Sequence, residues 1–325
     1  MSRLTRRGLV AAGLATPFVA RHGVAQSDWP KGPVRWVVAF AAGGAADTVA
    51  RNIAVRASEI LNQQVIIENR TGGNAVVAAN FVLQAPRDGQ TFLIDAANQV
   101  TNPHLIKDLP FDYPATWIPV TLMSSFPQVL AVKQDFPAKT IQEYLAAAKA
   151  KPGTISYGTP PAAGMGQMAG EELQRRAEIK LIHVPYRGGA DAARDIGAAS
   201  IDSVIITTNS IRPPVAAGRA RVLAVTSLKR SSAFPDAPTL NESGFPGFDL
   251  NDWNGMFAAT GTPAAVVDRM QAVIAEAVKD TKVRERLDPT GADLVANSPA
   301  EFKTWLTGQR ELLGKLIVAA GIKLQ

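Results

Sequence analysis

The sequence has no cysteine and only three histidines among its 325 residues. The absence of cysteine excludes disulfide bonds, a lipid anchor on a cleavage-site cysteine, and metal sites built from thiolates. His22 lies in the N-terminal segment, and His104 and His183 are far apart in the sequence, so we expect no metal site. His183 lies in a strand-like run, which favours a core or hinge histidine over a ligand.

Motifs of several enzyme classes are missing as well. No Gly-x-Ser-x-Gly elbow is present, which argues against a serine hydrolase of that type. Gly43-Gly44 lacks the third glycine of a dinucleotide-binding fingerprint, and residues 308–315 do not have the spacing of a phosphate-binding loop. The chain has no basic run with interleaved aromatic residues, so nucleic acid is not an expected partner. We predict a protein without catalytic activity and without a cofactor.

An apolar run at residues 8–20 is too short to span a bilayer. It follows three arginines and precedes the small residues Gly23-Val24-Ala25, so residues 1–25 are predicted to be a cleaved signal peptide. Thr5-Arg6-Arg7 fits the twin-arginine export pattern, although ordinary secretory signals also contain paired arginines. Loss of the four arginines in this segment lowers the formal net charge from +6 to +2. We expect a soluble periplasmic monomer, with a charge compatible with an anionic ligand.

Alternating strand-like and helix-like segments indicate an α/β fold. Residues 34–40 are almost continuously apolar, as in a strand buried on both faces. Asp47 opens a helix with an apolar face. Residues 65–67, 75–83 and 92–94 are predicted to form a strand, a helix and a strand.

A second series of the same kind follows. Thr140 to Glu143 is a capping box that opens an alanine-rich helix, and Ser298 to Glu301 is another. Thr262 is predicted to cap a helix that starts with Pro263. The strands of this part are predicted at residues 129–132, 155–157, 181–184, 204–206 and 222–225.

Two such series joined by extended segments predict two lobes with a cleft between them, each with a mixed, mostly parallel sheet. We place lobe 1 at residues 26–124 and 226–325, and lobe 2 at residues 125–225. The crossings are predicted near residues 121–125 and 225–227. Two crossings allow the lobes to hinge.

Two glycine-rich loops, residues 40–47 and 157–166, each join a predicted strand to a predicted helix. Free N–H groups at a helix start, together with the helix dipole, can hold a carboxylate without a cationic side chain. Small residues let the backbone approach such a ligand closely. Glycines in these loops are also common in plain turns, so that alternative stays open.

Three charged residues near these loops have two interpretations each. Asp47 is either the N-cap of its helix or an acceptor for a ligand hydroxyl or ammonium group. Asp252 is either an exposed loop acid or a contact at the cleft rim, where Trp253 would supply an aromatic wall. Arg187 either pairs with a ligand carboxylate or forms a structural ion pair.

Several short segments occur in the order found in one known family. Together they make the chain resemble the solute-binding proteins of tripartite tricarboxylate transporters, the Bug family, over nearly all of the length after residue 25. The segments are Val38–Asp47, Glu68–Arg70, Ala85–Gly89, Lys149–Gly153, His183–Gly188, Ala217–Arg219, Ala224–Ser227, Phe234–Thr239, Gly261–Pro263 and Ala319–Ile322.

The resemblance implies a two-lobed periplasmic binding protein of type II (Venus flytrap) that closes on its ligand. Relatives bind small carboxylates and deliver them to a two-subunit membrane permease, or sometimes present them to a sensor. Such a sensory role, or an exported hydrolase, is the alternative function. The first loop is expected to hold the ligand carboxylate, and residues 159–167 are expected to close from the other lobe.

The chain also departs from the family pattern. Ala41 and Ala42 stand where relatives commonly have prolines, and the second loop is less polar than theirs. With Pro161 and Met165 present there, an acid with an apolar or aromatic body is favoured over citrate. The predicted ligand-binding residues are Phe40, Gly43, Gly44, Ala45, Ala46, Asp47, Asn98, Thr159, Gly164, Met165, Gln167, Thr208, Asn209 and Asp252.

Overall fold

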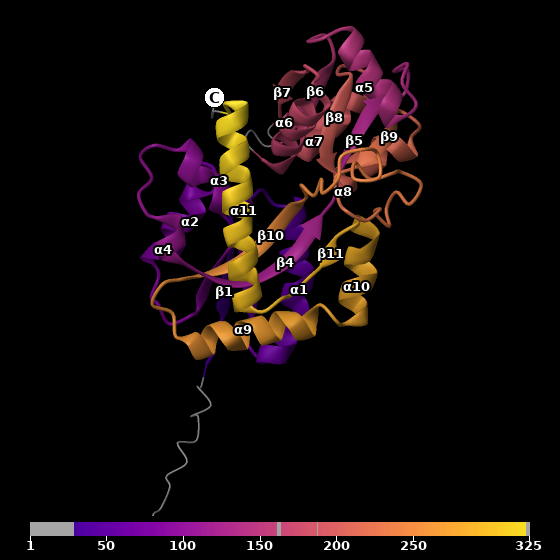
Figure 1. Ribbon diagram of the computed structural model, residues 1–325. Helices are drawn as coiled ribbons and strands as arrows, with labels where there is room; N and C mark the ends of the chain where they lie inside the picture. Colours follow the sequence, from indigo (N-terminus) through magenta and orange to yellow (C-terminus); the bar gives the residue numbers. More distant parts are fainter. Residues whose placement is uncertain (1–28, 161–163, 187, 323–325) are drawn as a thin grey trace, which may run out of the picture.

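The computed structural model describes residues 29–160, 164–186 and 188–322 and contains two β-sheets, each covered by helices (Figure 1). The predicted signal peptide, residues 161–163 of the second loop, and Arg187 lie outside the described residues.

The first sheet has six strands in the order β11-β4-β10-β3-β1-β2. Strands β1, β2 and β3 pair in parallel, whereas β10 is antiparallel to both β3 and β4, and β11 is antiparallel to β4. The strands are β1 (Val34–Val38), β2 (Val65–Asn69), β3 (Thr91–Asp95), β4 (Trp117–Phe126), β10 (Asp252–Ala259) and β11 (Asp293–Leu294).

Helices cover both faces of this sheet, which explains why β1 is apolar at nearly every position. Trp36 and Val38 pack in one core with helices on one face, and Val37 packs in a second core on the other. The helices of this part are α1 (Ala45–Leu61), α2 (Val76–Gln84), α3 (Asn98–Leu105), α4 (Tyr113–Thr116), α9 (Ala264–Ala277), α10 (Thr281–Leu287), the 3-10 turn η1 (Asp288–Thr290) and α11 (Pro299–Ala320).

The second sheet has five strands in the order β7-β6-β8-β5-β9. Strand β5 is antiparallel to β8 and β9, and the β6 pairings are parallel. The elements are β5 (Gln128–Lys133), α5 (Ile141–Ala150), β6 (Ser156–Thr159), α6 (Met165–Ala177), β7 (Ile182–Pro185), α7 (Gly189–Gly197), β8 (Ser203–Thr207), α8 (Thr208–Ala216) and β9 (Ala220–Val225).

The predicted fold class is confirmed: the protein is α/β with two lobes, and each lobe has a mixed sheet in which most strands run one way. Only β10 and β11 oppose the other described strands of the first sheet, and only β5 opposes those of the second. The reversals of β5 and β10 arise where the chain enters one sheet directly from the other instead of returning through a helix. Strand β11 follows β10 through α9 and α10 and runs in the same direction as β10.

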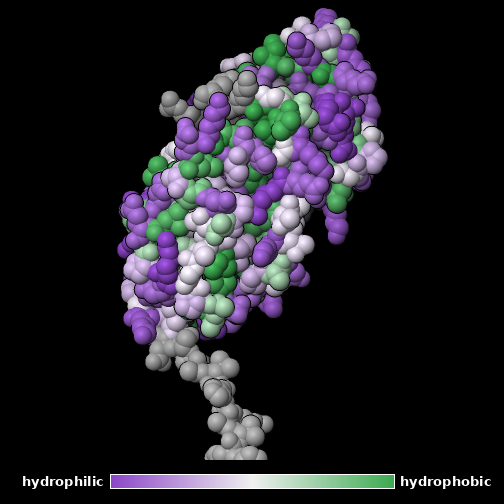
Figure 2. Space-filling view, turned by 60° about the vertical axis from the view of Figure 1, so that its left-hand side comes forward, coloured by the Kyte–Doolittle hydropathy of each residue, from purple (hydrophilic) through white to green (hydrophobic). Residues whose placement is uncertain are grey.

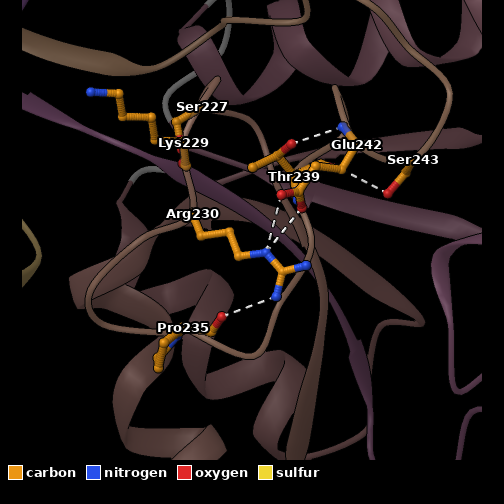
Figure 3. Close-up of polar contacts among 7 residues, drawn as sticks. All are labelled: Ser227, Lys229, Arg230, Pro235, Thr239, Glu242 and Ser243. Atoms are coloured by element: carbon orange, nitrogen blue, oxygen red, sulfur yellow. Dashed lines mark hydrogen bonds and ion pairs between the residues drawn. The ribbon is translucent and has the colours of Figure 1, made fainter.

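The long connection between β9 and β10 is held on the second sheet by its own polar contacts (Figure 3). Arg230 forms an ion pair of 3.0 Å with Glu242, whose backbone N–H donates to Thr239 Oγ1 at 2.9 Å. Thr239 in turn forms a β-bridge with Val225. We therefore propose that lobe 2 extends to residue 250, and that the chain crosses at Pro127 and again near Asn251.

Helix α11 packs against both lobes, as Figure 1 shows for its course from the first sheet towards α6. Its buried residues Phe302 and Leu306 share a core cluster with Leu93 of β3 and with Leu173 of α6. The apolar face of one helix thus contributes to a core that extends across both lobes.

Several local predictions can be compared with the structure. The Ser298 capping box is present. At Thr140 only half of the predicted box forms: Thr140 Oγ1 accepts the Glu143 N–H, but the Glu143 carboxylate accepts the N–H of Lys139. The cap of α9 was predicted one residue too early: the N-cap is Pro263, and the Thr262 hydroxyl instead donates to the carbonyl of Ala259 at 2.8 Å.

On the face that Figure 2 shows, hydrophobic residues occur in small groups among hydrophilic ones. The most exposed large hydrophobic side chain is Val318 on α11, at 78% exposure. Among the described residues, no helix combines the length and the apolar character needed to cross a membrane.

Two glycines provide a test of the packing between α11 and the first sheet. A Cβ on Gly255 of β10 would overlap the buried ring of Phe302, whereas a Cβ on Gly308 of α11 meets nothing within 4 Å. We expect Gly255→Ala to lower the free energy of unfolding by about 1–3 kcal/mol. Gly308→Ala is expected to raise it by about 1 kcal/mol, through helix propensity alone. Chemical denaturation measures both, and a neutral Gly255→Ala would contradict the packing described.

Candidate ligand-binding site

A cavity of about 990 Å³ lies between the two lobes and is lined by residues from both. The first lobe contributes the loop after β1, the loop after β3, and two side chains of β10. The second lobe contributes the starts of β5, α6, α7 and α8. The cavity is therefore the cleft that the two-series pattern predicts.

Five helices begin at this cavity, and none of the five is capped by a side chain. Their N-cap residues all line the wall, and three of them are glycines: Gly44 of α1, Ala97 of α3, Gly164 of α6, Gly188 of α7 and Thr207 of α8. The first N–H groups of a helix have no partner within the helix. The wall therefore presents several sets of amide donors, each at the positive end of a helix dipole.

Helices that begin elsewhere differ in this respect. Side chains cap α4, α5, α10 and α11, through Asp112, Thr140, Asp280 and Ser298, and none of these residues lines the cavity. Helices α2 and α9 also lack a side-chain cap but begin away from the cavity. Side-chain caps thus occur at four helix starts outside the cavity and at none of the five that line it, so uncapped starts are concentrated at the cleft.

The first loop is held in place by hydrogen bonds to Asp47, which is buried at 3% exposure. Its carboxylate accepts the N–H of Gly43 at 2.9 Å, Arg51 Nε at 2.9 Å and Asn69 Nδ2 at 2.8 Å. Asn69 also donates to the carbonyl of Phe40 at 3.0 Å, so both ends of the loop are tied to β2. Asp47 is not among the residues that line the cavity.

The surroundings of Asp47 favour its charged form. Burial by itself raises the pKa of this carboxyl, but the hydrogen bonds from Arg51, Gly43 and Asn69 outweigh it and hold the pKa below its ordinary value. Asp47 is in the first turn of α1, where a negative charge also interacts favourably with the helix dipole. The N-cap of α1 is Gly44, so the predicted capping role of Asp47 is wrong.

The second loop is described only at its two ends. Pro160, Gly164 and Met165 line the cavity, with Met165 supplying an apolar side chain. Thr159 and Gln167 are not part of the wall. The Thr159 hydroxyl is 2.7 Å from His183 Nε2, so the side chains of Thr159 and His183 are partners of each other inside lobe 2.

Side chains of Gln128, Asp252 and Asn254, which we call the polar floor, lie where the chain passes between the sheets. Gln128 is 2% exposed, and its Oε1 has no hydrogen-bond partner. Asp252 accepts the N–H of Trp253 at 2.9 Å, and burial raises its pKa to about 6. Asn254 Nδ2 donates to Ser124 Oγ at 3.3 Å.

The start of α8 divides its polar residues between the cavity and the core. Thr207, Asn209 and Ser210 line the cavity and hydrogen-bond to one another through the Thr207 hydroxyl. Thr208, predicted as a ligand contact, is fully buried and absent from the wall. A Cβ on Gly291 would lie 2.7 Å from its Oγ1, so Thr208 faces the loop before β11 instead.

Ten of the fourteen predicted ligand residues therefore line one cavity, and Asp47, Thr159, Gln167 and Thr208 do not. Trp253 was expected to form an aromatic wall there, but it is buried at 1% exposure, with its ring centroid 5.1 Å from that of Trp305. Residues of the wall that the sequence did not single out include Gln128, Gly188, Gly189, Ser210 and Asn254.

The described part of the wall carries few charged side chains. These are Asp252 on the floor and two arginines on lobe 2, Arg194 and Arg219. Arg194 is already paired with Asp191 at 3.0 Å and with Asp195 at 3.2 Å. Within the described part of the wall, backbone amides at helix starts therefore outnumber free cationic side chains as possible partners for an anion.

Two lobes around a ligand-sized cavity that is rich in helix starts define a two-lobed solute-binding protein. The comparisons with known proteins agree. The model of the tripartite tricarboxylate transporter family receptor matches residues 49–322, and the chain belongs to this family. The resemblance seen in the sequence is thus confirmed.

Individual relatives match over almost the whole chain. The UPF0065 protein in the tcbD-tcbE intergenic region of Pseudomonas sp. (strain P51) is 36% identical over 318 residues, which cover 96% of this chain and 94% of that protein. The structure of R. palustris Rpa4515 with adipate has a TM-score of 0.84 at 29% identity, with 91% of this chain and 100% of that chain covered. The structure of the periplasmic binding protein BugD has a TM-score of 0.80 at 31% identity and the same coverage.

The network around Asp47 gives a prediction for the first loop. We expect Asp47→Ala to lower the free energy of unfolding by about 2 kcal/mol at pH 7, because charge-assisted hydrogen bonds are lost. The native pKa of Asp47 is lowered, so its contribution exists above the unfolded pKa of about 4 and disappears as the pH falls through the native pKa. Thermal unfolding should therefore show a smaller gap between variant and wild type at pH 3 than at pH 7.

The same variant tests whether Asp47 touches the ligand. Because Asp47 lies beneath the loop, its removal should weaken all bound carboxylates by a similar factor. A loss confined to hydroxy or amino acids in calorimetry would show instead that Asp47 contacts the ligand directly.

Proposed function

We propose that this protein captures a small carboxylate with an apolar or aromatic body in the cleft between its lobes and delivers it to a two-subunit membrane permease. The observation that carries the proposal is the convergence of five helix starts without side-chain caps on one cavity. The first N–H groups of these helices have no partner within the helix, and no side chain caps them. Some are satisfied by nearby carbonyls, as when Gln99 N–H donates to Ala96 and Thr208 N–H donates to Pro127. Others remain available to a ligand. Closure of the lobes on a carboxylate would bring the donors of both lobes to it.

The character of the wall supports an acid with an apolar body. Ala45, Ala46, Ala97, Pro160 and Met165 line the cavity and offer aliphatic surface. A tricarboxylate would need donors for three anionic groups, and the described wall has one arginine, Arg219, outside the ion pairs given above. The structure of R. palustris Rpa4515 with adipate, whose fold this chain shares, supports a carboxylate ligand in general.

The membership in a receptor family supports a role in transport without catalysis. The N-terminal sequence supports export to the periplasm, with a twin-arginine signal removed after Ala25. The protein is proposed to act as a monomer, with the permease as its partner.

A carboxylate placed at a helix start tests the function directly. Gly164 has φ −80° and ψ 175°, the extended conformation of an N-cap, which aspartate also adopts. In Gly164→Asp the new carboxylate would take the amides of α6 and repel an anionic ligand. We expect thermal stability to be unchanged or slightly raised, while affinity for the best-binding acid in a thermal-shift and calorimetric screen falls at least tenfold.

Gly164→Asn is the matched control, because asparagine caps the helix without adding charge. Its affinity should fall less than that of Gly164→Asp, and the gap between the two variants should narrow at high salt. Full affinity in Gly164→Asp would refute the role of the α6 start. A screen in which no small acid stabilises the wild-type protein would refute the function itself.

A further inference from the structure

The polar floor differs chemically from the walls of the same cavity. The walls present backbone N–H donors at helix starts, and these suit an anion. The floor presents the carboxylate of Asp252 and the amide of Gln128, together with Asn254, whose Nδ2 is taken by Ser124. One cavity therefore offers both N–H donors and side-chain acceptors. The acceptors come from β5 and β10, with Gln128 paired to Thr207 at the start of α8.

Gln128 is held rigidly by its backbone while its side chain has an unused acceptor. Its N–H donates to Thr226 Oγ1 at 3.0 Å, and its carbonyl accepts the N–H of Thr226 at 2.9 Å. The side chain is almost fully buried, lines the cavity, and leaves Oε1 without a partner. A buried polar atom without a hydrogen bond is costly, so a donor on a ligand would relieve that cost.

Asp252 lines the same cavity as the first residue of β10. It is paired with Phe126 of β4, which ends two residues before Gln128. The Asp252 carboxylate accepts the N–H of Trp253, and among the described residues it forms no ion pair. A second carboxylate of a ligand in this region would meet a like charge in a partly dehydrated cleft. A hydroxyl, an ammonium group or a ring N–H would instead donate to Asp252.

We propose, on the basis of the function above, that the ligand is a monocarboxylate with a hydrogen-bond donor at its far end, and that Asp252 and Gln128 accept from this donor. The walls bind the carboxylate and the floor selects the hydroxy or amino form. Plain diacids are disfavoured because their second carboxylate faces Asp252. Asp252 of β10 thus takes the acceptor role that the sequence suggested for Asp47.

The test uses matched acids on three skeletons: four-carbon, six-carbon and benzene. Each skeleton is supplied as the plain monocarboxylate, the hydroxy acid, the amino acid and the diacid, and affinities are measured by calorimetry at pH 8. In the best-binding series, we expect the hydroxy or amino form to bind at least tenfold more tightly than the diacid. Asp252→Asn should narrow this ratio to less than threefold, mainly because the diacid gains affinity.

Two further variants separate a specific contact from a general effect. Asp249→Asn removes the same charge three residues away, at a carboxylate outside the cavity wall that accepts from Asn251, and it should keep the wild-type ratio. Gln128→Leu should weaken the hydroxy form at least fivefold and leave the plain monocarboxylate within twofold of wild type. This second comparison stands even if one of the aspartate variants folds poorly.

The outcomes distinguish this proposal from the function on which it rests. If acids bind but the diacid binds as tightly as the hydroxy form, selection by the floor is overturned and carboxylate capture stands. The same conclusion follows if Asp252→Asn leaves the ratio of hydroxy-acid to diacid affinity unchanged. If no acid of any series binds, carboxylate capture fails and the proposal fails with it.

Discussion

Backbone N–H groups in the first turn of a helix must find acceptors outside the helix, and this requirement governs the cleft. Elsewhere in the described chain, residues such as Asp112, Thr140, Asp280 and Ser298 supply the acceptor. At the cleft the N-cap residues are glycine, alanine or a threonine whose side chain does not cap the helix. The first loop is held by hydrogen bonds from side chains outside the cavity wall. The Asp47 network does this for α1, because it fixes the loop without covering the amides of the helix start.

Features set by neighbouring residues could be predicted from the sequence. The buried strand β1, the glycine loop after it and the capping box at Ser298 all depend on a few consecutive residues. Their local chemistry allows few alternatives. The two-lobed arrangement followed from the repeated order of strands and helices, which leaves little choice of topology. The position of ten predicted residues on one wall is a consequence of that arrangement.

Features that depend on distant pairings could not be predicted in the same way. Strand β10 was missed, because residues 252–259 become a strand only by pairing with β3 and β4, far earlier in the chain. Gln128 and Asn254 of the polar floor were missed with it, whereas Asp252 was predicted. The partner of Asp47 that fixes the loop, Asn69, is 22 residues away on β2. Thr208 and Asn209 are adjacent in sequence, and only the packing around Gly291 decides that one is buried and the other faces the cavity.

Helix α11 has a consequence for how the chain is made. This helix packs against α3 and β4 of the first lobe and against α6 of the second. These elements leave the ribosome more than a hundred residues earlier. Until the helix has been synthesised, the part of the core that it shares with both lobes stays uncovered, so the nascent chain keeps apolar surface available to chaperones. The docking of both lobes on the same helix is thereby postponed to a late stage of synthesis.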